Sequence, residues 1–254
     1  MKKILAILLA LTLLLSLASC SRFNLFGNDE EEEELPREKV PYTSSKVEES
    51  LEAMRNNGGF LIQMTMRSSG TGVESESESV IFAQTARRLY FRSSTLEGIV
   101  DFYSVDGADV YIKNEKGKWE KTAYLYDNLG TTRQTIEEKY ADHIEPLIDC
   151  LKAHSMIEGQ NLEKTESIVA GRACDQYIMK QQVLGMGAEV SFSIDKETGI
   201  CLEMDTTAGF GSLGSASTTF TCTRYEQPFT IDLPTSYVDV TEDDNTETPS
   251  DFEE

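Results

Sequence analysis

Apolar residues repeat first at helical spacing and then at strand spacing along the middle of the chain. Residues 45–57 carry apolar side chains at i, i+4 and i+7, and the opposite face of that helix is charged. Ser45 followed by Glu48 is typical of a capping box, and Gly58 ends the pattern. This segment predicts an amphipathic helix that buries one stripe.

From residue 60 the hydrophobic period changes to two, as expected for a strand with one face on a core. The first such strand places Phe60, Ile62, Met64 and Met66 on one face. Similar patterns follow at residues 80–84, 89–92, 99–104, 110–113 and 119–122. Turn signals such as Asp106-Gly107 separate several of them, which predicts an antiparallel meander.

Helical spacing returns between residues 131 and 154, where we expect Pro146 to divide the apolar run into two helices. Strand patterns then resume at residues 164–169, 174–180, 189–194, 200–205 and 218–225. Strands outnumber helices and no βαβ alternation appears, so the fold class is α+β with an antiparallel sheet.

The N-terminus has the features of a signal peptide. Lys2 and Lys3 precede an apolar stretch that is too short and wrongly flanked for a spanning helix. Leu17-Ala18-Ser19-Cys20 resembles the bacterial lipobox, which implies that residues 1–19 are removed and that Cys20 receives a diacylglyceryl group. The alternative is an ordinary cleaved signal with an incidental cysteine. Acyl chains such as palmitate would anchor the mature protein, since burial is worth ~0.8 kcal/mol per CH₂.

Acidic segments flank the middle of the chain. The protein has 44 Asp and Glu against 23 Lys and Arg, a net charge of −21. Residues 29–34 are all acidic, and residues 236–254 contain no Lys or Arg. Because such segments cannot repay the entropy of ordering, we expect an acidic disordered tether at 20–43, a folded domain at 44–237 and an acidic disordered tail at 238–254.

Several short motifs occur in order along the chain. They are the lipobox, the leading helix, a Gly-Lys-Trp turn at 117–119, Ala170-Gly171-Arg172 before Cys174 and Tyr177, a hairpin at 193–202, and Ile231-Asp232-Leu233-Pro234. Together they resemble the LolA, LppX and RseB group of bacterial envelope proteins. The resemblance implies a curved antiparallel half-barrel of about 10–11 strands, closed by the N-terminal helix and the central helical segment. It also implies binding of acyl chains or lipoproteins, and no catalytic residue.

A curved sheet has one concave apolar face, and helices over that face leave either a packed core or a ligand cavity. The candidate lining residues are Phe60, Ile62, Met64, Met66, Phe82, Leu89, Phe91, Val110, Ile112, Phe192 and Leu202. The glycine-flanked loop residues Val183, Leu184 and Met186 could line a cavity mouth or fold back onto the sheet. Ordinary core packing is the alternative for each of these residues.

The sequence shows no convincing motif for catalysis, metal binding or nucleic-acid binding. Residues 209–214 match G-x-G-x-x-G but join two predicted strands and open no helix, so the dinucleotide interpretation fails. The chain has neither C-x-x-C nor H-E-x-x-H, and no nucleophile matches His143 or His154. The basic residues form no cluster for phosphate binding. We therefore expect no enzyme activity, no metal or other cofactor, and no nucleic-acid partner.

Four cysteines remain after Cys20: Cys150, Cys174, Cys201 and Cys222. Outside the cytoplasm they could pair in three ways. A symmetric hairpin around residues 209–214 would place Cys201 opposite Cys222, at a separation suited to a disulfide. We predict that disulfide; buried free thiols are the alternative.

Two functions of different classes fit these observations. The first is a membrane-anchored extracytoplasmic lipoprotein that binds or senses a hydrophobic ligand, an acyl chain, lipid or lipoprotein, in the half-barrel. The second is a non-enzymatic envelope adaptor or structural lipoprotein with a packed core and a protein partner. In either case, the expected location is the outer face of the cytoplasmic membrane, or the outer membrane in a host that has one.

Overall fold

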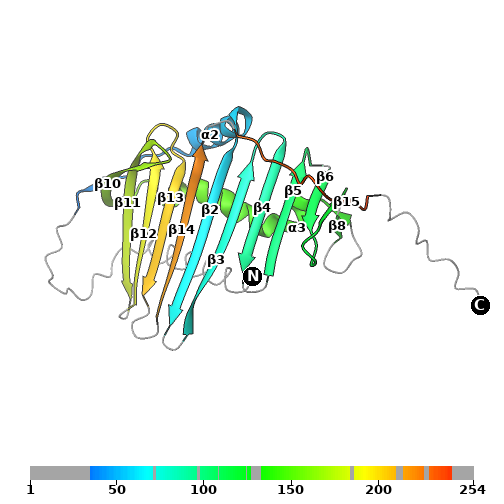
Figure 1. The fold of residues 1–254 in the computed structure, drawn as a ribbon. Helices are drawn as coiled ribbons and strands as arrows, with labels where there is room; N and C mark the ends of the chain where they lie inside the picture. The colour runs from blue at the N-terminus through cyan, green and yellow to red at the C-terminus, as the bar shows by residue number, and fades with distance from the viewer. Residues whose placement is uncertain are drawn as a thin grey trace, which may run out of the picture.

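The structure is a computed structural model that describes residues 35–70, 73–95, 98–107, 109–123, 125–126, 133–183, 186–209, 214–225 and 229–241. One large twisted sheet dominates it, with helices against one face (Figure 1). The expected signal peptide, the lipidation site Cys20 and most of the expected tether and tail lie outside these residues.

The helices are α2 (Ser44–Asn57), α3 (Ile136–Leu151) and the short 3₁₀ helix η1 (Ala153–Met156). The strands before α3 are β1 (Arg37–Lys39), β2 (Phe60–Gly70), β3 (Val73–Gln84), β4 (Arg88–Thr95), β5 (Gly98–Val105), β6 (Asp109–Lys113), β7 (Trp119–Thr122), β8 (Leu125–Tyr126) and β9 (Arg133–Gln134). Those after it are β10 (Asn161–Val169), β11 (Arg172–Val183), β12 (Met186–Asp195), β13 (Cys201–Gly209), β14 (Gly214–Tyr225) and β15 (Val238–Asp239).

Two meanders meet in the middle of the sheet. The 13 strands follow the order β1-β10-β11-β12-β13-β14-β2-β3-β4-β5-β6-β7-β15, while β8 and β9 form a separate pair. Every pair in the large sheet is antiparallel except β15 with β7. The α+β class and the antiparallel sheet are thus confirmed, and the sheet is open, with β1 and β15 at its edges.

The folded unit extends beyond 44–237 at both ends. β1 pairs with β10 inside the range expected to be a disordered tether. β15 pairs with β7 at the start of the range expected to be a disordered tail. These short edge strands lack hydrophobic alternation; they pair with the free backbone groups of the neighbouring strand, and in β1 the ion pair of Glu38 with Lys164 and the buried Val40 after the strand add to this pairing.

Helix α2 begins at Ser44, and its start is not capped as the sequence suggested. The N-cap residue is Thr43, whose side chain makes no capping hydrogen bond, and the Ser45–Glu48 capping box is therefore wrong. Past its end, Gly59 has φ +90°, and a Cβ there would lie 2.1 Å from the carbonyl oxygen of Gln84. Glycine is required at this turn because β3 ends so close to it.

Helix α3 has a true capping box, in which Thr135 and Glu138 exchange side-chain and backbone hydrogen bonds. The helix bends at Tyr140, which has φ −112° and ψ 15°, and Pro146 lies inside it. The run is divided as expected, but at the kink at Tyr140 and not at Pro146. Its missing N–H leaves the carbonyl of Asp142 without a helical partner, and Asp142 is exposed, so water can bond that carbonyl.

The acidic stretch 74–78 belongs to strand β3 rather than to a turn. Ser77 and Glu78 pair with Arg67 and Met66 of β2.

No helix within the described ranges is long and apolar enough to cross a membrane.

Candidate functional site

The inner face, defined as the sheet face that packs against α2 and α3, is built from residues that the strand register sets side by side. One row runs through Ile62, Phe82, Phe91 and Phe102 on β2 to β5. The next row runs through Tyr177, Phe192, Met204, Phe220, Met64 and Val80 on β11 to β14, β2 and β3. We call these two the upper rows; all of their members are buried.

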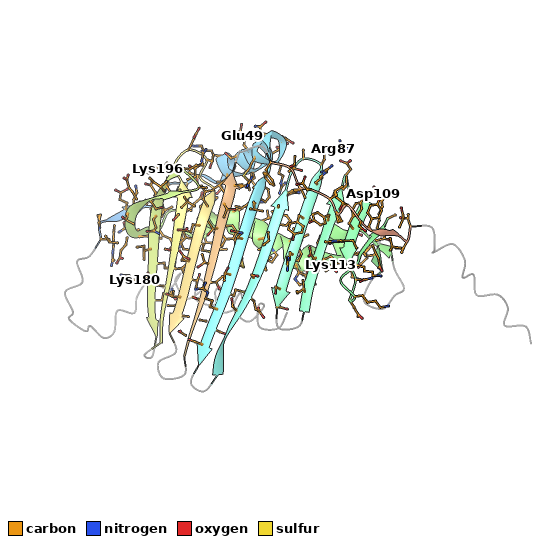
Figure 2. All side chains as sticks on the ribbon, in the orientation of Figure 1. Glu49, Arg87, Asp109, Lys113, Lys180 and Lys196 are labelled. Atoms are coloured by element: carbon orange, nitrogen blue, oxygen red, sulfur yellow. The ribbon has the colours of Figure 1, made fainter. Side chains whose placement is uncertain are left out.

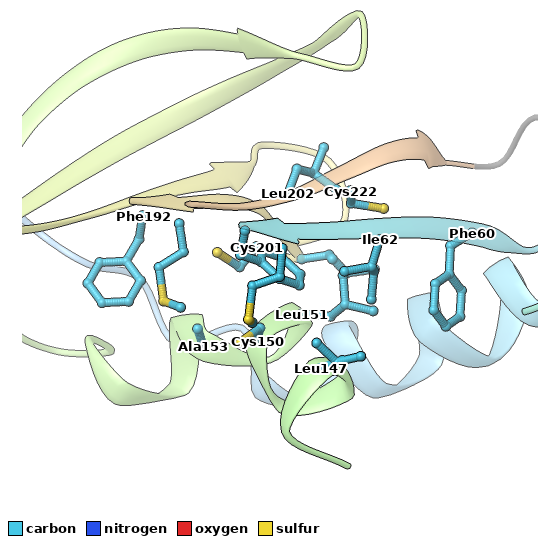
Figure 3. Close-up of a cluster of buried hydrophobic side chains, with 14 of the residues drawn as sticks. Phe60, Ile62, Leu147, Cys150, Leu151, Ala153, Phe192, Cys201, Leu202 and Cys222 are labelled. Carbon is cyan, nitrogen blue, oxygen red and sulfur yellow. The ribbon is translucent and has the colours of Figure 1, made fainter. Parts of the chain in front are cut away.

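The helices pack directly against the upper rows. Leu147, Cys150 and Leu151 of α3 point toward the strands that carry Ile62 and Cys201 (Figure 3). Tyr140 stacks on Phe102, with ring centroids 4.7 Å apart. This part of the inner face is therefore a packed core, which holds the helices on the sheet.

Beyond the upper rows the side chains become smaller or more flexible. A third row holds Met179, Val190, Thr206, Thr218, Met66 and Glu78. A fourth holds Gln181, Ala188, Ala208, Ala216 and Ser68. We call these two the lower rows. In Figure 1, β11–β14, β2 and β3 continue past both helices toward the lower end of the sheet, where these rows lie.

The structure divides the predicted lining residues into two groups. Phe60, Ile62, Phe82, Phe91, Val110, Phe192 and Leu202 are each at most 2% exposed and belong to the packed core, with Leu89 and the partly buried Ile112. Met64 and Met66 are buried at the border of the upper and lower rows. Val183 and Met186 pair at the lower end of β11 and β12, but their side chains and all of Leu184 lie outside the described residues.

Sequence reasoning missed most of the lower rows. Their alanines, serine, threonines and glutamine give no apolar alternation, so no single strand marks them as one surface. The available signal was the register, which aligns Ala188, Ala208 and Ala216 across three strands. That alignment depends on pairings between distant segments.

A separate pocket of about 230 Å³ lies where the start of α2 meets the ends of β11 and β12. Its lining includes Val40, Lys46, His154, Lys164, Asp175, Tyr177 and Lys196. Lys164 Nζ lies 2.7 Å from Oε2 of Glu38 and 3.2 Å from Oδ2 of Asp175. Lys196 also pairs with Asp175, at 3.2 Å. These ammonium groups are already paired, so we interpret the pocket as a structural junction.

His154, in η1, is one of the residues that line this junction. It is 2% exposed, and its Nε2 lies 3.2 Å from Oε1 of Glu158. Burial lowers the pKa of His154, although the Glu158 carboxylate acts in the opposite sense. Burial also raises the pKa of Glu158, but hydrogen bonds from Thr43 and Ser44 outweigh it and hold that pKa below its ordinary value. The junction thus favours a neutral imidazole beside an ionised carboxylate.

Other charged side chains form ion pairs on the outer face, the face opposite the inner face, and Lys113, labelled in Figure 2, belongs to one of them. Lys113 Nζ lies 3.6 Å from Asp101 and 5.2 Å from the ring centroid of Trp119. On the same outer face Tyr90 stacks on Tyr103 at 4.6 Å. Within the described ranges, no group of three or more His, Cys, Asp or Glu residues could hold a metal ion.

The predicted disulfide between Cys201 and Cys222 does not form; both thiols are free and buried, as are those of Cys150 and Cys174. The register pairs Glu203 with Thr221, and one further step sets Cys222 opposite Leu202. A register displaced by one residue from the symmetric hairpin explains why the predicted pairing fails. Residues 209–214 do join two antiparallel strands, as expected.

Comparisons with known proteins concern the fold. No protein-family model matches the chain, and no curated protein matches it. The crystal structure of the Mycobacterium tuberculosis lipoprotein LppX is similar at 13% identity and a TM-score of 0.35, covering 74% of this chain and 95% of that one. A LolA superfamily protein from Nitrosomonas europaea is similar at 7% identity and a TM-score of 0.28, covering 76% of this chain and 94% of that one.

Both structures come from the group that the sequence motifs resemble. The large, open, mainly antiparallel sheet of this chain is given by its own strand order and register.

Proposed function

We propose that the protein is a non-enzymatic extracytoplasmic lipoprotein that binds an apolar ligand on the lower rows of its inner face. The ligand is an acyl chain, a lipid or the lipid part of a lipoprotein. Residues 1–19 act as the signal peptide, and acyl chains on Cys20 anchor the mature chain to the outer face of the cytoplasmic membrane, or to the outer membrane where the host has one.

The change of side-chain size along the inner face carries this proposal. Against the helices the upper rows are mostly aromatic and closely packed, whereas the lower rows hold methionine, valine, threonine, alanine and serine, with Glu78 and Gln181 at their ends. Alanine and serine side chains extend less far from the sheet than the rings of the upper rows, and methionine adapts its shape to what it contacts. An apolar chain lying there gains roughly 25 cal/mol for each Å² removed from water.

The dimensions of the lower rows suit an extended chain. The third row crosses six strands, from Met179 on β11 to Glu78 on β3. At about 4.8 Å between neighbouring strands, the row is roughly 24 Å long. An acyl chain across the strands would contact each strand in turn.

The packed upper rows and an aromatic group on the outer face favour the adaptor function as the second candidate. The ring of Tyr103 stacks on that of Tyr90, and its centroid lies 5.2 Å from the ring centroid of Trp119. All three rings are half-buried. Tyrosine and tryptophan are enriched at protein interfaces. Neither the pocket at the start of α2 nor the one beside Glu48 and Arg55 lies on the lower rows.

Mass spectrometry of organic extracts tests the proposal. The full-length protein would be purified from membranes in a mild detergent, and a lipoprotein with the same signal peptide but a different domain would be purified in parallel. We expect non-covalent lipid in near-stoichiometric amount with this protein only. Equal lipid in both extracts would contradict the binding function and leave the adaptor function.

A further inference from the structure

Polar side chains interrupt the apolar surface of the lower rows. Thr206 of β13 is 7% exposed, and its hydroxyl oxygen is buried with no hydrogen-bond partner in the structure. Thr218 of β14 lies directly opposite it and is 9% exposed. In the next row, the side-chain oxygen of Gln181 is also buried without a partner. Two polar atoms on this surface are therefore unsatisfied.

Such atoms call for a physical explanation. A buried hydroxyl or amide oxygen without a hydrogen bond costs free energy, and most buried polar groups in proteins have a protein or water partner. Valine has nearly the same shape as threonine and would remove this cost at position 206. Val190, beside Thr206 in the same row, shows that valine fits this surface.

A buried water is a poor hydrogen-bond partner for the Thr206 hydroxyl at this position. A stable buried water needs two to four polar partners. The neighbours of Thr206 across the strands are Val190 on one side and Thr218 on the other, and Met204 and Ala208 lie along its own strand on the same face. Thr218 is the one polar group among them, so a water at this place would have too few partners.

We propose that the bound apolar ligand carries a polar group along its chain, a hydroxyl or an amide, which forms a hydrogen bond with the Thr206 hydroxyl, a group that can both donate and accept. This inference rests on the proposed binding function and names the ligand class: a hydroxylated or amide-linked acyl chain rather than a plain hydrocarbon chain. Gln181 offers a second position, where the ligand's group would be a donor, because the free atom of Gln181 is a carbonyl oxygen and can only accept.

The spacing of the polar positions sets the geometry. Thr206 and Gln181 lie on β13 and β11, two strands apart, with Val190 and Ala188 of β12 between them. Two strand spacings are about 9.6 Å, so a single donor cannot reach both oxygens. The ligand's polar group bonds at the Thr206–Thr218 pair, and a second group, a donor, bonds at Gln181 where the ligand has one.

A competition experiment tests this assignment. The full-length protein in phosphatidylcholine nanodiscs would receive equal amounts of octadecanoic acid and of octadecanoic acids hydroxylated at different carbons, and native mass spectrometry would count the bound species. We expect at least one hydroxylated acid to be bound about three- to tenfold more than octadecanoic acid, as one net hydrogen bond provides.

Two variants separate the hydroxyl from the shape of the side chain. Thr206→Val should bring the ratio to about one while retaining octadecanoic acid, and melting curves should show that it folds at least as stably. Thr207→Val is the matched control, because Thr207 is the next residue and is exposed on the other face. It should leave the ratio unchanged.

The outcomes distinguish this inference from the function on which it rests. Equal binding of plain and hydroxylated acids by the unaltered protein, or a preference that Thr206→Val retains, would overturn the inference and leave the binding function standing. Absence of either acid from the unaltered protein would overturn both.

Discussion

Glu158 caps helix α2 from 115 positions away in the sequence: its Oε1 accepts a hydrogen bond of 2.5 Å from the backbone N–H of Thr43. Its Oε2 accepts a second, of 2.7 Å, from the hydroxyl of Ser44. A carboxylate at a helix N-terminus also interacts favourably with the helix dipole. One side chain thus joins the first helix to the segment after α3.

Replacing Glu158 with alanine should destabilise the protein. The variant leaves the Thr43 N–H without its acceptor, and loss of an N-terminal cap costs about 0.5–2 kcal/mol. Urea denaturation followed by circular dichroism measures the change. Glu49→Ala is the control, since Glu49 is exposed on α2 (Figure 2) and should change the free energy of unfolding by less than about 0.5 kcal/mol. Equal effects would rule out the capping role.

Stability should fall as the pH is lowered below about 6.5. Burial holds the pKa of His154 in the folded protein below its ordinary value of 6.5, and the same holds for the half-buried His143. The unfolded chain therefore binds protons first, and stability is lost as the pH falls from 6.5 toward the folded pKa. Glu158, whose folded pKa is lowered, adds a further loss below about 4.5.

Denaturation at pH 7.5 and pH 5.5 measures this dependence. His154→Gln removes one titrating group, so the loss of stability between these two pH values should be smaller than in the unaltered protein. An unchanged pH dependence in this variant would contradict a buried neutral His154.

The four cysteines of the folded domain should be unreactive thiols. Burial raises the pKa of Cys150 and of Cys222 to about 12, and that of Cys174 to about 11, so little thiolate forms at neutral pH. A chromogenic thiol reagent should react slowly with the native protein and with all four thiols in denaturant, with or without reductant. Two additional thiols that appear only after reduction would show a disulfide.

A large side chain in the lower rows should block ligand binding without disturbing the core. Ala208→Trp adds bulk between Ala188 and Ala216 on the inner face, away from the packed upper rows. We expect the lipid recovered in organic extracts to fall at least fivefold and the melting temperature to stay within a few degrees. Thr207→Trp, on the exposed outer face, is the matched control and should retain its lipid.

Local patterns in the sequence determined the kinds of elements. Period two in residues 60–66 predicted β2, and apolar spacing with Gly58 predicted α2 to within one residue of its start. These predictions hold because a strand or helix buries one face with a fixed period, which neighbouring residues alone reveal. The core residues Phe82, Phe91 and Phe192 followed from the same signal.

Long-range pairing decided what the sequence left open. The junction of β14 with β2, the carboxylate of Glu158 at the start of α2 and the side-by-side placement of Thr206 and Thr218 join segments far apart or depend on an exact register. A one-residue change of register turns a side chain to the other face, as the misplaced Cys201–Cys222 pair shows. Local periodicity identifies the strands, but only the packed sheet fixes which residues meet across them.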